Sequence, residues 1–157
     1  MPFWPQNVIV TPEVFLGILG KVSVKYLPAD VIDLTGGGGA YGELEWKVPE
    51  GQTWYIYKVG MVKSGVLADD WWSITLYVDG KPIETVGSFS REFDIPLINA
   101  FSGFRAQYSV KIIYRVGINF QGFITPDVRV LTIGKGTEQK LIDQFTEIWN
   151  NITKGGT

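Results

Sequence analysis

The chain has 157 residues and a formal net charge of −2, from 14 Lys and Arg against 16 Asp and Glu. It contains no histidine and no cysteine, which excludes histidine- and cysteine-based catalytic groups, disulfides and the usual zinc and haem ligands. The length fits one domain, and 19 glycines with 14% aromatic and 19% charged residues favour strands and tight turns over surface helices.

Residues 1–20 form an apolar N-terminal segment with no basic region before it, so we expect no signal peptide. Thr11-Pro12-Glu13 is a favourable helix start, with a hydroxyl N-cap, a proline at the first helical position and an acid in the first turn. The short apolar helix that follows would need cover from its own domain or from a neighbouring subunit. Phe15 is therefore a candidate oligomer contact. No apolar stretch reaches the roughly 20 residues of a membrane-spanning helix.

Residues 21–134 are predicted to form a β-sandwich domain, because the hydrophobic period changes to two from about residue 21. Asp79-Gly80 between two alternating runs predicts a type I′ hairpin turn. The predicted strands cover residues 21–26, 43–48, 53–63, 71–78, 83–86, 93–97, 108–118, 123–125 and 128–133. Eight or nine strands separated by turn signals indicate an all-β fold, a two-sheet antiparallel sandwich with a jelly roll as the first choice.

Residues 137–154 are predicted to form a C-terminal amphipathic helix, with Thr137 as its cap after Gly134 and Gly136. Apolar residues recur at helical spacing, and they are Leu141, Ile142, Phe145, Ile148, Trp149 and Ile152. The helix either packs on its own sandwich or meets a copy of itself or another subunit. In the second case the candidate oligomer contacts are Leu141, Phe145, Ile148, Trp149 and Ile152.

Aromatic residues crowd the strands near residues 54 and 72 and occupy both parities: Trp54, Tyr55, Tyr57, Trp71, Trp72 and Tyr77. Since the two faces of a strand cannot both point into one core, some of these rings face outward. Such rings are covered by the chain's own segments, buried by a partner subunit, or free to stack on a sugar. The candidates for ligand stacking are Tyr55, Tyr57, Trp71 and Trp72.

Motifs that carry chemistry are weak in this chain. Gly37, Gly39 and Gly42 spell G-x-G-x-x-G, but an alternating strand follows where a dinucleotide site needs a helix. A carboxylate–lysine pattern typical of metal-dependent nucleases occurs at Asp33, Glu45 and Lys47, where two acids would hold Mg²⁺. A second match, at Asp127, Glu138 and Lys140, straddles a strand and a helix start. We expect no catalytic site, no cofactor and no metal, and hence not an enzyme.

The basic residues are scattered singly, with no Lys/Arg run. Nothing in the sequence therefore provides the strong positive field that supplies most nucleic-acid affinity. We do not expect nucleic acid as a partner.

Two stretches carry a resemblance to a group of known proteins. Residues 44–56 contain a strand ending in Val48-Pro49-Glu50-Gly51 and then an aromatic strand, and residues 76–80 read Leu-Tyr-Val-Asp-Gly. This resembles a recurrent pattern in structural proteins of phage and archaeal-virus particles. The resemblance spans roughly residues 44–80 and implies a jelly-roll capsid, decoration, spike or turret component. It implies a place in the virion, with the chain itself and other particle proteins as partners. Since we expect neither a signal peptide nor a membrane-spanning helix, we also expect the chain to be made as a soluble cytoplasmic protein.

Three functions follow as hypotheses of different classes. The first is a homo-oligomeric structural protein of a virus particle. The alternative is a glycan-binding β-sandwich module for host attachment, with Trp71 and Trp72 as stacking platforms. The third is a divalent-metal nuclease that uses Asp33, Glu45 and Lys47.

Overall fold

A computed structural model describes residues 22–64, 71–88, 93–96 and 101–154, except for the side chains at positions 145, 148, 149 and 151–154. The predicted N-terminal helix, with Phe15, lies outside these residues. The described elements are β1 (Val22–Tyr26), β2 (Ile32–Asp33), β3 (Ala40–Lys47), β4 (Gln52–Ser64), β5 (Trp72–Val78), β6 (Lys81–Gly87), β7 (Phe93–Asp94), β8 (Phe104–Ala106), β9 (Ser109–Val116), β10 (Phe123–Gly134) and α2 (Lys135–Lys154).

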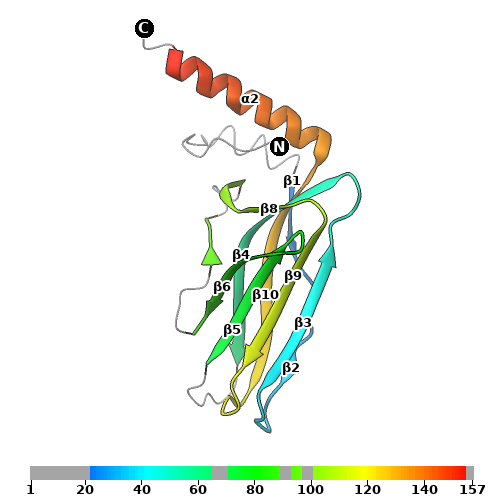
Figure 1. Ribbon diagram of the computed structural model, residues 1–157, viewed down its shortest axis with the longest axis vertical. Coiled ribbons are helices and arrows are strands. Elements are labelled where there is room, and N and C mark those ends of the chain that lie inside the picture. Colours follow the sequence, from blue (N-terminus) through cyan, green and yellow to red (C-terminus); the bar gives the residue numbers. More distant parts are fainter. Residues whose placement is uncertain (1–21, 65–70, 89–92, 97–100, 155–157) are drawn as a thin grey trace.

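The strands form two antiparallel sheets, which confirms the predicted all-β class (Figure 1). The six-stranded sheet has the order β1-β10-β4-β7, with β2 also paired to β10 and β8 to β4, and the four-stranded sheet has the order β3-β9-β5-β6. Apart from the β4–β10 and β5–β9 contacts, each strand pair lies inside the previous pair along the chain. β1 pairs with β10, β3 with β9, β4 with β7 and β8, and β5 with β6.

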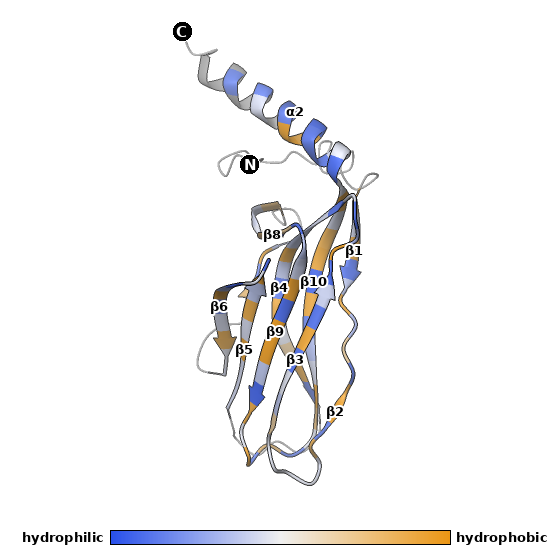
Figure 2. Ribbon diagram, turned by 45° about the vertical axis from the view of Figure 1, so that its right-hand side comes forward, coloured by the Kyte–Doolittle hydropathy of each residue, from blue (hydrophilic) through white to orange (hydrophobic). Residues whose placement is uncertain are grey.

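The main core lies between the two sheets. Hydrophobic and hydrophilic residues alternate along β3 (Figure 2), and its Leu44 and Trp46 pack against this core while Glu43 and Glu45 are exposed. The centre of the core comes from Ile56 of β4, Ile74 of β5 and Ile112 of β9, which are completely buried. The strand period of two therefore places one face of each strand inside, as the sequence predicts.

The six-stranded sheet is also covered on part of its outer face. Tyr55 of β4, with Leu131 and Ile133 of β10, packs there against Leu141 of α2 and forms a second apolar cluster. Figure 1 shows α2 at one end of the sandwich, with much of its ribbon continuing beyond the ends of the strands. Only the first turns of the helix therefore cover the sheet.

The hairpin turn at Asp79-Gly80 is confirmed. Asp79 has φ 52° and Gly80 has φ 82°, as a type I′ turn requires at both central positions. The glycine loop before β3 also has the expected context, since Gly37 to Gly39 have positive φ and a strand begins at Ala40.

Several predicted boundaries differ from the structure, and the sequence patterns did not predict β2 or β8. The segments 123–125 and 128–133 form one continuous strand, β10. On the side of β10 that faces β1 and β2, Pro126 has no paired residue, so its missing N–H breaks no hydrogen bond to those strands. The helix begins at Lys135, before Thr137, because β10 runs directly into it. No helix in the described part of the chain combines the length and the apolar character that crossing a membrane requires.

Candidate functional site

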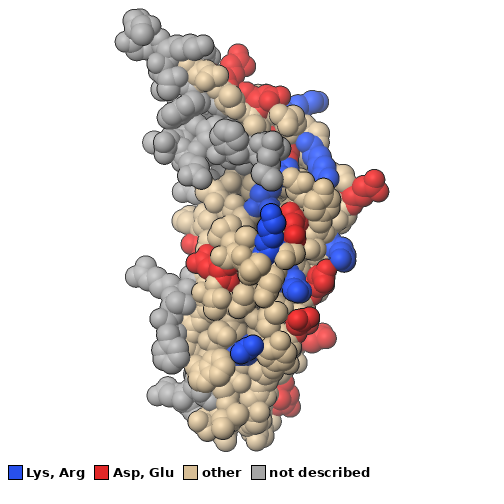
Figure 3. All heavy atoms as spheres, in the orientation of Figure 1, with Lys and Arg blue, Asp and Glu red and all other residues tan. Residues whose placement is uncertain are grey.

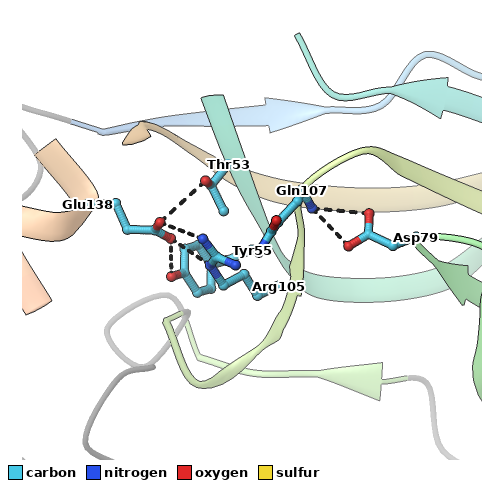
Figure 4. Close-up of polar contacts among 6 residues, drawn as sticks. All are labelled: Thr53, Tyr55, Asp79, Arg105, Gln107 and Glu138. Atoms are coloured by element: carbon cyan, nitrogen blue, oxygen red, sulfur yellow. Dashed lines mark hydrogen bonds and ion pairs between the residues drawn. The ribbon is translucent and has the colours of Figure 1, made fainter. Parts of the chain in front are cut away.

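The base of α2 is fixed to the six-stranded sheet by a buried polar cluster (Figure 4). We call Thr53, Tyr55, Arg105 and Glu138 the helix anchor. Tyr55 of β4 and Arg105 of β8 are directly paired across strands and project from the outer face of the sheet. Glu138 lies in the first turn of α2, where the helix dipole favours a carboxylate. The anchor thus joins residues that are far apart in the chain.

The geometry of the helix anchor is that of a fork-to-fork ion pair. Arg105 donates from Nε to Glu138 Oε2 at 2.9 Å and from Nη2 to Oε1 at 2.8 Å. The hydroxyl of Tyr55 donates to Glu138 Oε2, and that of Thr53 donates to Oε1 at 3.4 Å. The side chain of Glu138 is 2% exposed and that of Arg105 is 16% exposed. Such bidentate, charge-assisted bonds fix orientation as well as supplying energy.

The titration of Glu138 follows from these contacts. Burial by itself would raise the pKa of this carboxyl, but the hydrogen bonds from Arg105 and Tyr55 and the charge of Arg105 outweigh it. The pKa of Glu138 therefore lies below the ordinary value for a glutamate. Glu138 is therefore a charged carboxylate at neutral pH, and in this form it binds α2 to the sheet.

Acid is expected to weaken the helix anchor. Because the pKa of Glu138 is lower in the folded chain than in the unfolded chain, its stabilisation is present above the unfolded value and is lost as pH falls through the folded value. We expect the stability advantage of the unaltered chain over Glu138→Gln to shrink as pH falls from about 7 to about 3. Urea titrations across that range measure it. An advantage that stays constant would contradict the expectation.

A second carboxylate holds the corner where the chain passes from one sheet to the other. Asp79, in the β5–β6 turn, accepts the backbone N–H of Tyr108 at 2.7 Å and that of Ser109 at 3.1 Å, both on Oδ1. The N–H of Gln107 lies 3.1 Å from both oxygens (Figure 4). One side chain therefore satisfies three donors between β8 of the six-stranded sheet and β9 of the four-stranded sheet.

Two substitutions of Asp79 distinguish its contribution to the backbone conformation of the turn from its contribution as a hydrogen-bond acceptor. Asp79→Asn keeps a residue that tolerates positive φ and one acceptor oxygen, so we expect a loss of about 1 kcal/mol in unfolding free energy. Asp79→Ala loses both features, and we expect about 2–3 kcal/mol. Denaturant unfolding of the two variants measures the difference. Equal losses would show that the carboxylate contacts contribute little.

The outer faces of both sheets carry stacked cations. On the four-stranded sheet, Arg115 lies 5.2 Å above the ring of Tyr41, and Lys47 pairs with Glu45 at 2.7 Å. On the six-stranded sheet, Arg129 lies 4.5 Å from the ring centre of Tyr26. On the face drawn in Figure 3, basic and acidic side chains interleave and neither sign dominates.

The structure separates the residues on which the nuclease hypothesis depends. Asp33 lies on β2 of the six-stranded sheet and bonds to Thr35, whereas Glu45 and Lys47 lie on β3 of the four-stranded sheet and pair with each other. Of the second match, Asp127 pairs with Arg129 and Glu138 with Arg105. Within the described residues, no three acidic side chains gather as a metal site would require.

The four candidate stacking residues differ in their exposure to solvent. Tyr55, Tyr57 and Trp72 are buried, which corrects their assignment as sugar platforms, because a buried ring offers no face to a ligand. Tyr55 is covered by the chain itself, with Phe101 edge-on to its ring at 5.3 Å. Trp71 is 41% exposed. Trp71 is therefore the only one of these four candidates that is exposed.

The candidate oligomer contacts are placed only in part. Leu141 is buried against the six-stranded sheet of its own chain, so it anchors the helix. The side chains of Phe145, Ile148, Trp149 and Ile152 lie outside the described set, as does Phe15. Their backbone positions 145–152 belong to α2.

Sequence reasoning missed the Arg105–Glu138 pair. One signal was present: Glu138 stands three and four residues before Leu141 and Ile142, so it occupies the apolar stripe of the helix. A carboxylate on the buried side of a helix needs a cationic partner. The sequence does not identify that partner, since Arg105 is 33 residues away.

Searches of protein-family models, of curated proteins and of solved structures give no match for this chain.

Proposed function

We propose that this chain is a structural assembly protein that works by packing against copies of itself, and that its setting is a virus particle. In this proposal it is a jelly-roll capsid, decoration, spike or turret component, with other particle proteins as further partners. The resemblance over residues 44–80 supports the setting. The observations that support assembly lie in the strand order and in the helix.

The nested strand pairing supports the jelly-roll part of the proposal. A jelly roll contains eight strands in two Greek keys across two sheets. Here β1 pairs with β10, β3 with β9, β4 with β7 and β8, and β5 with β6. This is the order obtained when one long antiparallel hairpin rolls up into two layers.

The single observation that carries the assembly proposal is the arrangement of α2. Its first turns are fixed to the six-stranded sheet through Glu138 and Leu141, and its ribbon then continues beyond the strands (Figure 1). The apolar stripe of the sequence continues on that length at positions 145, 148, 149 and 152. A rigidly based helix with such a stripe is suited to bind a groove or a second helix of a neighbour.

A charge placed on the stripe tests this role. We expect Trp149→Glu to abolish or strongly weaken self-association, because burying an unpaired carboxylate in an interface is costly. Gln144→Glu is the matched control, since Gln144 is exposed and lies off the stripe. Light scattering of the full-length variants measures the effect. Loss in both variants or in neither would count against the helix as the assembly element.

A further inference from the structure

The outer face of the six-stranded sheet carries exposed apolar side chains away from the helix anchor. Tyr26 of β1 is 62% exposed, Val62 of β4 is 56% exposed and Phe123 of β10 is 42% exposed. All three lie opposite to the core face, because Ile124, Val128 and Val130 of β10 point inward. We call this surface the open platform, and it consists of Tyr26, Lys58, Val62, Phe123, Asp127 and Arg129.

Apolar groups lie at the two ends of the open platform. Tyr26 is paired with Arg129 at one end, and Val24 follows it on the same strand face with 42% exposure. At the other end, Phe123 of β10 is opposite Ser64 of β4, two residues from Val62. Phe123 and Val62 are therefore diagonal neighbours on the same face. Phe123 and Arg129 are six positions apart on β10, which is about 20 Å along the strand.

The middle of the open platform is charged and balanced. Arg129 binds Asp127 through Nε at 3.0 Å and Nη2 at 2.9 Å, and Lys58 pairs with Asp94 at 3.6 Å. Two cations therefore stand beside two anions. Gly60, opposite Asp127, adds no side chain that would hold a second surface away.

We propose that the open platform is a two-fold interface between two copies of this chain. A two-fold axis that lies in the contact surface and runs across the strands lays the Tyr26 end of one copy on the Val62 end of the other. Both ends then bury apolar surface, and the centre, whose charges are already paired within each chain, presents no net charge that would repel the same surface of the partner. The proposal rests on the self-assembly proposed above and names the surface for it.

The size of the platform sets its expected strength. About 20 Å along the strands and roughly 15 Å across them is about 300 Å² per copy, which is less than a specific interface of standard size buries. We therefore expect a weak, reversible dimer that forms at high micromolar concentration or above and is reinforced by further contacts, such as those of α2.

Two tyrosines provide a matched test. Tyr26 on the platform and Tyr41 on the other sheet are 62% and 63% exposed, and each has an arginine above its ring. We expect Tyr26→Glu to raise the dimer dissociation constant at least tenfold in sedimentation equilibrium, and Tyr41→Glu to leave it unchanged. Val62→Lys repeats the test at the other end, should Tyr26→Glu fail to fold.

Cross-linking tests the orientation, because the chain has no cysteine of its own. A mixture of Val24→Cys and Val62→Cys chains treated with a short thiol cross-linker should give more dimer than either chain alone, and Tyr41→Cys should give only background. Background yield throughout would overturn the proposed geometry.

The outcomes separate this inference from the proposed function. If Tyr26→Glu and Val62→Lys associate normally while Trp149→Glu does not, the two-fold interface is wrong and the assembly function stands. If the unaltered chain never associates, both are wrong. If Tyr26→Glu instead removes binding to a glycan array without changing association, the platform belongs to a glycan and the inference is overturned.

Discussion

Replacing Arg105 with methionine is expected to lower the free energy of unfolding by about 3–5 kcal/mol. The substitution leaves the carboxylate of Glu138, which is 2% exposed, without its cationic partner. A buried unpaired charge is costly because its solvation is lost and nothing replaces it. Denaturant unfolding followed by circular dichroism measures the loss.

A double variant distinguishes the cost of leaving Glu138 without a cationic partner from the cost of losing the packing contacts of Arg105. Arg105→Met combined with Glu138→Leu removes both charges, and we expect it to recover most of the stability, since replacing a buried pair by apolar groups is often neutral. Arg129→Met is the matched control. That pair with Asp127 has the same bidentate geometry, but its side chains are 31% and 12% exposed, more than those of Arg105 and Glu138, so we expect a smaller loss of about 1–2 kcal/mol. Equal losses at Arg105 and Arg129 would show that burial does not determine the anchor's contribution.

Replacing Ile112 with alanine is expected to cost about 2–5 kcal/mol. Ile112 is completely buried on β9, opposite Leu44 of β3 and Leu76 of β5, at the centre of the main core. Removing its three outer carbons leaves a cavity that the neighbouring strands cannot close, because the sheet fixes their spacing.

The next residue is the control for this prediction. Ile113 has the same side chain on the same strand, but it faces outward and is only half-buried. We expect Ile113→Ala to cost less than about 1.5 kcal/mol, in proportion to the smaller apolar area that it buries. A one-residue slip of β9 would exchange the two results. Thermal and urea unfolding of both variants would detect it.

The local features of the fold are the ones that sequence patterns predict. Asp79-Gly80 specifies its turn through backbone conformation at two adjacent residues, and the alternation of Leu44 and Trp46 with glutamates specifies which side of β3 is inside. Both signals depend only on neighbours in the chain. The amphipathic helix is likewise predicted by the spacing of its apolar residues, although its first residue, Lys135, is not.

Features that depend on distant contacts were not predictable in the same way. Tyr55 and Glu138 are 83 residues apart, so no local pattern reports that their side chains meet. The same holds for the outer face of the six-stranded sheet, where strand pairing alone brings Tyr26 beside Arg129. The sequence shows that aromatic rings lie on both faces of β4. Only the structure shows that the chain itself covers Tyr55.

The two proposals together assign the chain two surfaces for contact with copies of itself. One is the length of α2 beyond the anchor, and the other is the open platform on the six-stranded sheet. Two different self-contacts on one subunit generate rings or extended arrays when both are occupied. The proposal of a particle component depends on this capacity, and catalysis has no part in it.

Sedimentation velocity of the full, unaltered chain from about 1 μM to about 1 mM tests the central claim most directly. We predict species heavier than the 17.5 kDa chain whose share grows with concentration. A single 17.5 kDa species at every concentration would contradict the account.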